Sequence, residues 1–182
     1  MNDRMLELVA RLERISPMPD DDSSELTVPL LAEYEQVIRQ IEEAAKQAPE
    51  LDPALIQPLI ASFGYGDAFG LYWATLHLLE DFPSEQLRPA LCEAVQTGKP
   101  GARMWSAYML GVQRDRHDIP VLVGALKDSM SEVRYYTLMA LAMIGDSSAT
   151  VAMESLLQDP DPKVRKAVRK YVDELASLGN QS

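Results

Sequence analysis

Apolar residues recur along this chain with the period of an α-helix, most clearly between residues 131 and 144. Val133, Thr137, Ala140, Leu141 and Ile144 fall at positions i, i+4, i+7, i+8 and i+11, which draws one apolar stripe along a helix. Similar segments precede and follow this one. We expect four helical hairpins, formed by 54–63 with 67–81, 84–97 with 100–113, 118–127 with 131–144, and 148–158 with 162–176.

The hairpins repeat at an offset of 31 residues. Arg103, Arg134 and Arg165 are separated by this interval. Three further columns follow it, namely Leu79, Leu110 and Leu141; Pro58, Pro89 and Pro120; and Asp115 with Asp146. A fixed offset of this length is the signature of a helical repeat array, and one hairpin cannot cover its own apolar stripe. The predicted fold is therefore an all-α, right-handed α-solenoid of about four stacked hairpins.

The first fifty residues follow the repeat less well. The apolar positions of residues 5–15 predict a short amphipathic helix that ends at Pro17, and residues 24–47 predict a longer helix entered through residues 20–23. We interpret residues 1–50 as a helical cap on a solenoid of residues 51–182, all within a single domain. The segment 1–50 holds 12 acidic and 5 basic residues. A solvated cap explains this charge, and an acidic surface for a basic partner is the alternative.

Composition narrows the possible environments and ligands. The 182 residues are 47% hydrophobic, enough for an ordinary core, and the single Cys92 allows no internal disulfide. The sequence has no apolar run of 18 residues and no apolar stretch in residues 1–16, so we expect a cytoplasmic protein without a membrane span. The net charge of −11 disfavours nucleic acid and anionic lipid and favours a basic protein partner.

Two acidic residues stand at a fixed distance before two of the repeated arginines. Asp128 precedes Arg134 by six residues, and Asp159 precedes Arg165 by six. With Val133-Arg134 and the turn Ile144-Gly145-Asp146, these positions resemble HEAT repeats, especially the short 31-residue repeats first described in phycobilisome lyases. The resemblance covers residues 54–176. It implies that each arginine bonds to the aspartate before it, so that Asp128–Arg134 and Asp159–Arg165 form a structural ladder.

Residues suited to catalysis are scarce. His77 and His117 are the only imidazoles, and neither has the spacing of a metal ligand. The sequence has no Cys-x-x-Cys pair and no Gly-rich phosphate loop, and Cys92 has no histidine near it in sequence. We therefore expect no enzymatic activity, no metal and no cofactor.

The variable positions of the second helix in each hairpin are rich in aromatic residues and methionine. By resemblance to HEAT repeats this helix lines the inner, concave side of the solenoid. The predicted partner-binding residues are Trp73, His77, Met104, Trp105, Tyr108, Glu132, Tyr135, Tyr136 and Met139. Because a separate apolar stripe supplies the core, we expect the aromatic side chains to project outward as an interface patch. The alternative is that the same stripe belongs to the core.

These observations predict a non-enzymatic, monomeric protein-interaction module that binds a partner in its concave aromatic groove. This small, acidic chain is similar to HEAT-like proteins that neutralise a toxin by occluding it, so an immunity protein is the specific hypothesis. The alternatives are an adaptor, an assembly chaperone, or a helper protein similar to the bilin lyases.

Overall fold

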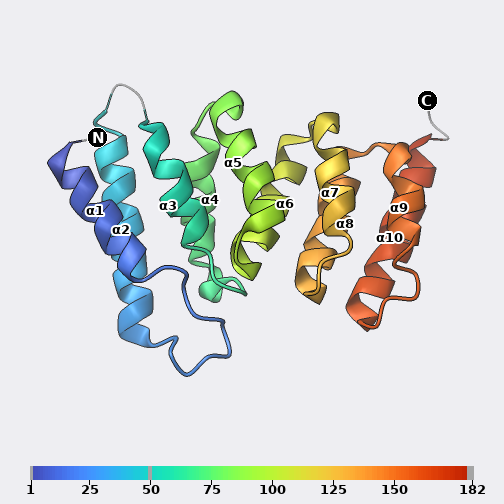
Figure 1. Cartoon of the computed structure of the whole chain (residues 1–182), viewed down its shortest axis with the longest axis horizontal. Coiled ribbons are helices and arrows are strands. Elements are labelled where there is room, and N and C mark those ends of the chain that lie inside the picture. The colour runs from blue at the N-terminus through green and yellow to red at the C-terminus, as the bar shows by residue number, and fades with distance from the viewer. Residues whose placement is uncertain (1, 49–50, 180–182) are drawn as a thin grey trace. The chain divides into compact units, whose positions relative to one another are not determined.

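The computed structural model describes residues 2–48 and 51–179, with side chains up to residue 176, and these residues form helices without a strand (Figure 1). The predicted all-α fold is confirmed. The α-helices of the described residues are α1 (Asp3–Arg14), α2 (Val28–Ala45), α3 (Ile56–Ala61), α4 (Tyr72–Glu80), α5 (Ser84–Thr97), α6 (Pro100–Gln113), α7 (Ile119–Ala125), α8 (Ser131–Ile144), α9 (Thr150–Glu154) and α10 (Pro162–Gly179).

The chain divides into two compact units, Met1–Ala90 and Leu91–Ser182, and the division falls inside α5. The single-domain organisation and the right hand of the solenoid remain predictions from the sequence.

Three of the predicted hairpin helices match the structure, and the first helices of the last two hairpins are shorter than predicted. Helices α5, α6 and α8 have the predicted bounds, whereas α7 and α9 begin one and two residues later and end two and four residues earlier than predicted. A 3-10 turn precedes each of them and begins at Asp115 or Asp146, whose carboxylates accept the backbone N–H groups of His117 and Ser148 at 2.9 and 2.8 Å. These local side-chain bonds compete with the first helical turn, which explains the later starts.

The segment between α1 and α2 differs from the prediction because an aspartate expected to cap a helix holds a loop instead. Helix α2 begins at Val28 and is capped by Thr27, so the predicted start near residue 24 is wrong. The Asp21 carboxylate accepts the backbone N–H groups of Asp67 and Ala68 at 2.9 and 3.0 Å. Ala68 and the following residue have φ of 48° and 55°, which is strained for residues with a side chain. Helix α4 consequently begins only at residue 72.

Three aromatic rings form the centre of the first unit. Tyr72 makes edge contacts with Tyr34 and Phe63, with ring centroids 5.6 and 5.3 Å apart. The Tyr34 hydroxyl lies 2.6 Å from the Thr75 hydroxyl and 3.1 Å from that of Ser62. Burial raises the pKa of Tyr34 to about 12. The unit thus satisfies its buried hydroxyl groups while packing α2 against α3 and α4.

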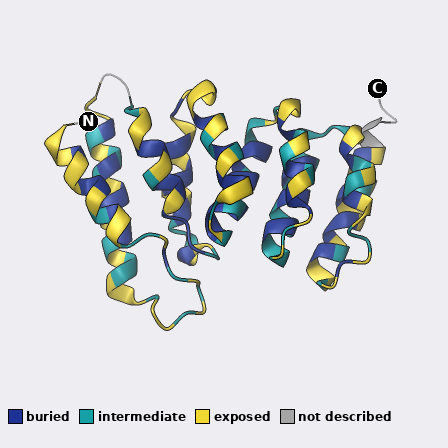
Figure 2. Ribbon diagram, viewed as in Figure 1, coloured by how far each residue is buried: buried dark blue, intermediate teal, exposed yellow. Residues whose placement is uncertain are grey.

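In the second unit, α8 packs between α6 and α10; the residues of α6 and α8 are all buried or half-buried, whereas α10 also has exposed residues (Figure 2). Helices α6 and α8 approach closely at Gly111, where a Cβ atom would lie 2.5 Å from the Cα of Ala140. The absence of a side chain at Gly111 therefore allows α6 and α8 to lie this close together.

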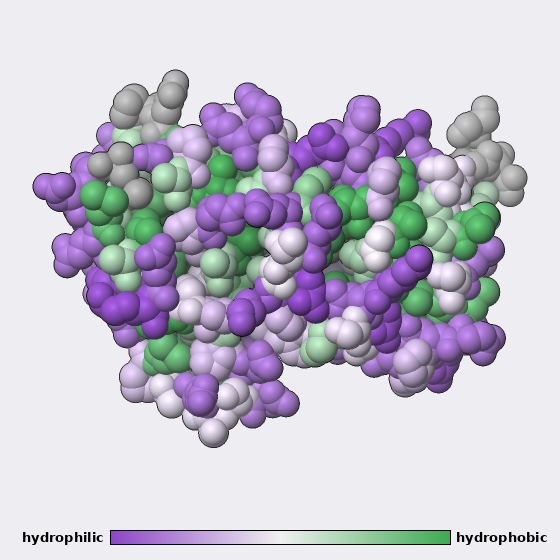
Figure 3. Space-filling view, viewed as in Figure 1, coloured by the Kyte–Doolittle hydropathy of each residue, from purple (hydrophilic) through white to green (hydrophobic). Residues whose placement is uncertain are grey.

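Hydrophilic side chains cover most of the margin of the face shown in Figure 3, with apolar areas between them.

We predict that Gly111→Ala lowers the free energy of unfolding by about 1–3 kcal/mol, because the added methyl group overpacks the α6–α8 contact. Gly124→Ala is the matched control, since no atom lies within 4 Å of the added Cβ and the loss of chain entropy on folding is reduced. Urea unfolding of both variants checks the prediction. Equal changes in both would contradict a steric role for Gly111.

Candidate functional site

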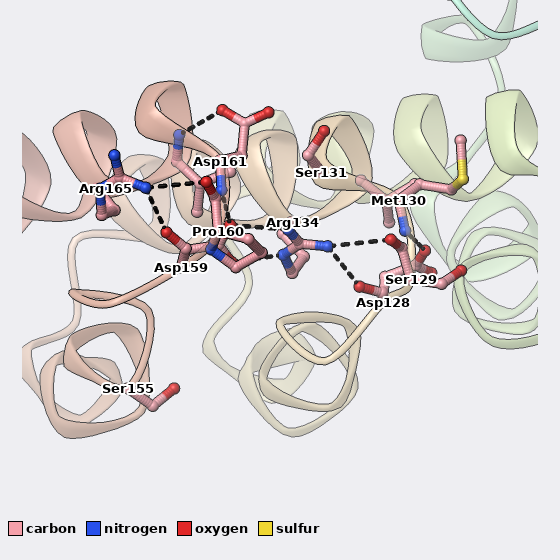
Figure 4. A network of polar contacts seen from close by, with 12 residues as sticks. Asp128, Ser129, Met130, Ser131, Arg134, Ser155, Asp159, Pro160, Asp161 and Arg165 are labelled. Carbon is pink, nitrogen blue, oxygen red and sulfur yellow. Dashed lines mark hydrogen bonds and ion pairs between the residues drawn. The ribbon is translucent and has the colours of Figure 1, made fainter.

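Two arginines bind carboxylates of the next hairpin in a forked geometry (Figure 4 shows Arg134 and Asp159). Arg134 donates from Nε and Nη2 to the two carboxylate oxygens of Asp159, both at 2.7 Å. Arg103 donates in the same way to Asp128, at 2.6 and 2.9 Å. Arg134 is 8% exposed and Asp159 5%. Two parallel charge-assisted bonds in such a place fix distance and orientation together.

The predicted hydrogen bonds of Arg134 to Asp128 and of Arg165 to Asp159 exist, but they do not involve the aspartate side chains. Arg134 reaches Asp128 through the main chain, with Nη1 donating to the Asp128 carbonyl oxygen at 2.8 Å, and Arg165 bonds the Asp159 carbonyl at 2.6 Å. Each aspartate side chain instead pairs with the arginine 25 residues earlier and accepts the N–H group two residues later. The ladder therefore joins successive hairpins. The sequence already contained the 25-residue spacing, including Arg103, which the prediction left out.

The ladder shifts the protonation equilibria of its members. Hydrogen bonds from Arg134 hold the pKa of Asp159 below its ordinary value. Burial acts to raise the pKa of Asp128, but hydrogen bonds from Arg103 and the backbone outweigh it, so that this pKa is also lowered. The bond to Asp159 in turn raises the pKa of Arg134. Both pairs are thus ionised at neutral pH.

Two of the predicted interface residues are buried. Met104 is 1% exposed and Trp105 2%, so the expectation that they project outward is wrong. Nine of the fourteen residues of α6 are buried. A helix packed on more than one side has no free face for these side chains. The alternative weighed from the sequence, that part of the aromatic stripe is core, holds for Met104 and Trp105.

Three tyrosines of α6 and α8 form a half-buried row over Trp105. Tyr136 lies between Tyr108 and Tyr135, with ring centroids 6.2 and 5.6 Å apart and edge-on geometry. The centroid of the Trp105 ring lies 5.9 Å from that of Tyr108 and 5.5 Å from that of Tyr136. We call Tyr108, Tyr135 and Tyr136 the tyrosine row. The predicted residues Glu132 and Met139 on α8 are half-buried as well.

The tyrosine row continues to α10 through residues that the sequence analysis did not select. The Lys163 ammonium lies 4.4 Å from the centre of the Tyr135 ring, a cation–π contact. Burial, with a contribution from Tyr135, raises the pKa of Tyr171 to about 12. Lys163 and Tyr171 were not among the predicted binding residues, because no local pattern reveals which ring a lysine will cover.

The remaining predicted residues, Trp73 and His77, lie on α4 in the first unit and are exposed. Trp73 is 46% exposed, and Phe69, in the strained loop before α4, is 73% exposed. The His77 ring nitrogen Nδ1 lies 3.1 Å from the Glu80 carboxylate. Phe69 is an exposed aromatic residue that the sequence analysis placed in the predicted helix 67–81 and did not select as a binding residue.

Within residues 2–48 and 51–179, no group of three or more His, Cys, Asp or Glu side chains is placed to hold a metal ion. The helices in these ranges also lack any span with the length and apolar character needed to cross a bilayer.

Comparison with known proteins supports the helical-repeat assignment. Residues 119–181, which contain α7 to α10, match the family model for HEAT repeats. The resemblance to HEAT repeats is confirmed. HEAT repeats generally act as scaffolds for protein–protein interaction. No curated protein matches the sequence.

A HEAT-repeat protein of known structure shares the fold. Human deoxyhypusine hydroxylase, solved in complex with glycerol, aligns over 94% of this chain with a TM-score of 0.55 and 18% identity. This chain covers 63% of the hydroxylase chain, less than two thirds of its length. Identity at this level supports a common fold and carries no statement about activity.

We predict that Arg134→Met lowers the free energy of unfolding by about 3–5 kcal/mol, because it leaves the buried Asp159 carboxylate without its partner. Arg169→Met, at an exposed position on α10, is the control and should change stability by less than about 0.5 kcal/mol. Urea unfolding followed by circular dichroism measures both. Similar losses in the two variants would contradict the importance of the ladder.

The ladder also predicts acid sensitivity. Because the pKa of Asp159 is lower in the folded chain than in the unfolded one, its contribution is complete above about pH 4, near the unfolded pKa, and is lost as the pH falls through the folded pKa. Unfolding free energies measured from about pH 6 to pH 2 should therefore fall more steeply for the natural chain than for Asp159→Asn. Parallel curves would contradict the pairing.

Proposed function

We propose that this protein is a non-enzymatic scaffold that binds a protein partner through the tyrosine row of its second unit. The observation that carries the proposal is the half-buried row in which Tyr136 makes edge contacts with Tyr108 and Tyr135, with the buried Trp105 ring against Tyr108 and Tyr136. HEAT repeats commonly present binding surfaces of this kind.

The tyrosine side chains lose little rotamer freedom when a partner binds, because they are already restricted in the free protein. Trp105 beneath, the neighbouring rings and Lys163 above Tyr135 already restrict the tyrosine side chains. A partner that covers the row therefore gains contact area with a small loss of rotamer freedom. Each phenol also retains a hydroxyl group that can donate or accept a hydrogen bond. Such residues commonly act as binding hot spots.

The negative charge that favours a basic partner lies in the first unit, residues 1–90. Residues 1–90 contain 17 acidic and 6 basic residues, a net charge of −11, whereas residues 91–182 contain 11 of each and are neutral. The tyrosine row thus lies in a unit without net charge. In this proposal the row supplies the close contacts, and the acidic residues 1–90 increase the rate of encounter with a basic protein.

The test compares capture by the tagged full chain with capture by Tyr135→Ala/Tyr136→Ala. We predict that a protein retained by the natural chain binds the double variant at least about 30-fold more weakly, the effect of losing a hot spot of about 2 kcal/mol. Titration of the purified partner measures the affinity. Melting curves establish that the variants are folded at the temperature of the assay.

Val151→Ser is the control, because Val151 is 79% exposed on α9 and belongs to the same unit. It should bind like the natural chain. A double variant that retains full affinity would contradict a role of the tyrosine row in binding.

The identity and number of captured proteins separate the specific hypotheses. A single tightly bound toxin whose growth inhibition is reversed supports an immunity protein, and several weaker partners support an adaptor or assembly chaperone. A bilin-lyase-like helper predicts instead a change in tetrapyrrole absorbance on mixing with the chain.

A further inference from the structure

Arg165 in α10 is held in the same way as the two arginines that bind aspartate. Its Nη1 donates to the carbonyl oxygens of Asp159 and Pro160 at 2.6 and 2.9 Å, as Nη1 of Arg134 does to Asp128 and Ser129 at 2.8 and 3.2 Å (Figure 4). Arg103 makes the equivalent bond to the Gly98 carbonyl at 2.9 Å. The three guanidinium groups are therefore anchored alike by the turn before their own helix.

The opposite edge of the guanidinium distinguishes Arg165 from the other two. In Arg103 and Arg134 the Nε and Nη2 groups bind both oxygens of one aspartate. Among residues 2–48 and 51–179, Arg165 makes hydrogen bonds through Nη1 alone. Its Nε–Nη2 edge is thus oriented by the same two carbonyl bonds while no described carboxylate binds it. Arg165 as a whole is half-buried, so part of its restrained side chain is open to solvent.

The surroundings of this edge favour an anion. Lys163, Lys166 and Arg169 lie within four residues of Arg165 on α10 and are exposed. The neighbouring Asp159 carboxylate already binds Arg134, and the Asp161 carboxylate accepts the backbone N–H of Lys163 at 2.7 Å. The Asp159 and Asp161 carboxylates are thus each bound elsewhere, and the additional cations lower the free energy of an approaching carboxylate.

We propose that the Nε–Nη2 edge of Arg165 is a binding site for an aspartate carboxylate of another protein. The arginine is preorganised for a bidentate contact, because the two carbonyl bonds fix its plane before the ligand arrives. The site extends the ladder by one position. It lies outside the tyrosine row and does not depend on the function proposed for that row.

The two occupied positions define the shape of the ligand. Asp128 and Asp159 each stand in a turn just before a helix, and each accepts the backbone N–H group two residues later at 2.9 Å. A matching ligand presents an aspartate in such a turn, as the segment Asp159-Pro160-Asp161 does. In a second copy of this chain, the Asp128 and Asp159 carboxylates are already bound by Arg103 and Arg134 of that copy, which favours a different protein as partner.

The test uses the ¹⁵N-labelled full chain and two blocked synthetic peptides. One has the sequence of residues 157–164, Leu-Gln-Asp-Pro-Asp-Pro-Lys-Val, and the other carries Asp159→Asn. We expect the aspartate peptide to shift the Arg165 Nε–H resonance in a saturable way. The Nε–H resonances of Arg103 and Arg134 serve as internal references and should not move, because their carboxylate sites are occupied. The asparagine peptide should bind at least tenfold more weakly.

Two variants of the chain separate the fork geometry from charge. Arg165→Lys keeps the charge but loses the planar fork, and it should weaken binding of a fluorescent aspartate peptide at least tenfold. Arg169→Lys, one helical turn further along α10, should bind like the natural chain. Equal binding of the two peptides, equal affinity in Arg165→Lys, or an unchanged Arg165 resonance would each overturn the site. The two-peptide comparison on the natural chain decides the question even where Arg165→Lys does not fold.

Discussion

The second unit depends on a bond between an arginine of one hairpin and an aspartate of the next. Asp128 and Asp159 each serve two arginines, one through the carboxylate and one through the carbonyl oxygen. A buried ion pair stabilises a fold only when its geometry compensates for the lost hydration. In each turn, two carboxylate oxygens and two backbone carbonyl oxygens accept hydrogen bonds from two arginines. These four bonds meet the condition and set the register between neighbouring helices. The other contacts of the unit form within that register.

The tyrosine row is supported by a buried tryptophan. Trp105 is on the same helix as Gly111, which approaches Ala140 of α8 closely, and the Trp105 side chain is almost completely buried. The indole therefore fills the interior, and the smaller phenol rings above it become the accessible layer. Tryptophan is a common interface residue, but here Trp105 is buried and restricts the motion of the tyrosine rings that contact it. The surface available to a partner is defined by the rings that the tryptophan supports.

The sequence predicted repeats because their positions recur at a fixed interval, and it failed where a contact is formed by residues without such a pattern. The bounds of α6 and α8 follow from apolar periodicity, and the arginine column marks the ladder. The partner of Arg134 could not be chosen between two aspartates, since six and 25 residues are equally regular spacings. The buried Trp105 packs against Tyr136 of another helix, and the bonds of Asp21 to Asp67 and Ala68 cross 46 and 47 residues.

The uneven distribution of charge gives the two units different responses to ionic strength. All of the excess negative charge lies in residues 1–90, where mobile counterions screen repulsion between like groups and so favour the compact state. The neutral second unit has little net repulsion to screen, and its buried arginine–aspartate pairs are largely shielded from the same ions. Added electrolyte therefore acts on one half of the molecule and leaves the other nearly unchanged, so that the relative stability of the two halves varies with the ionic environment.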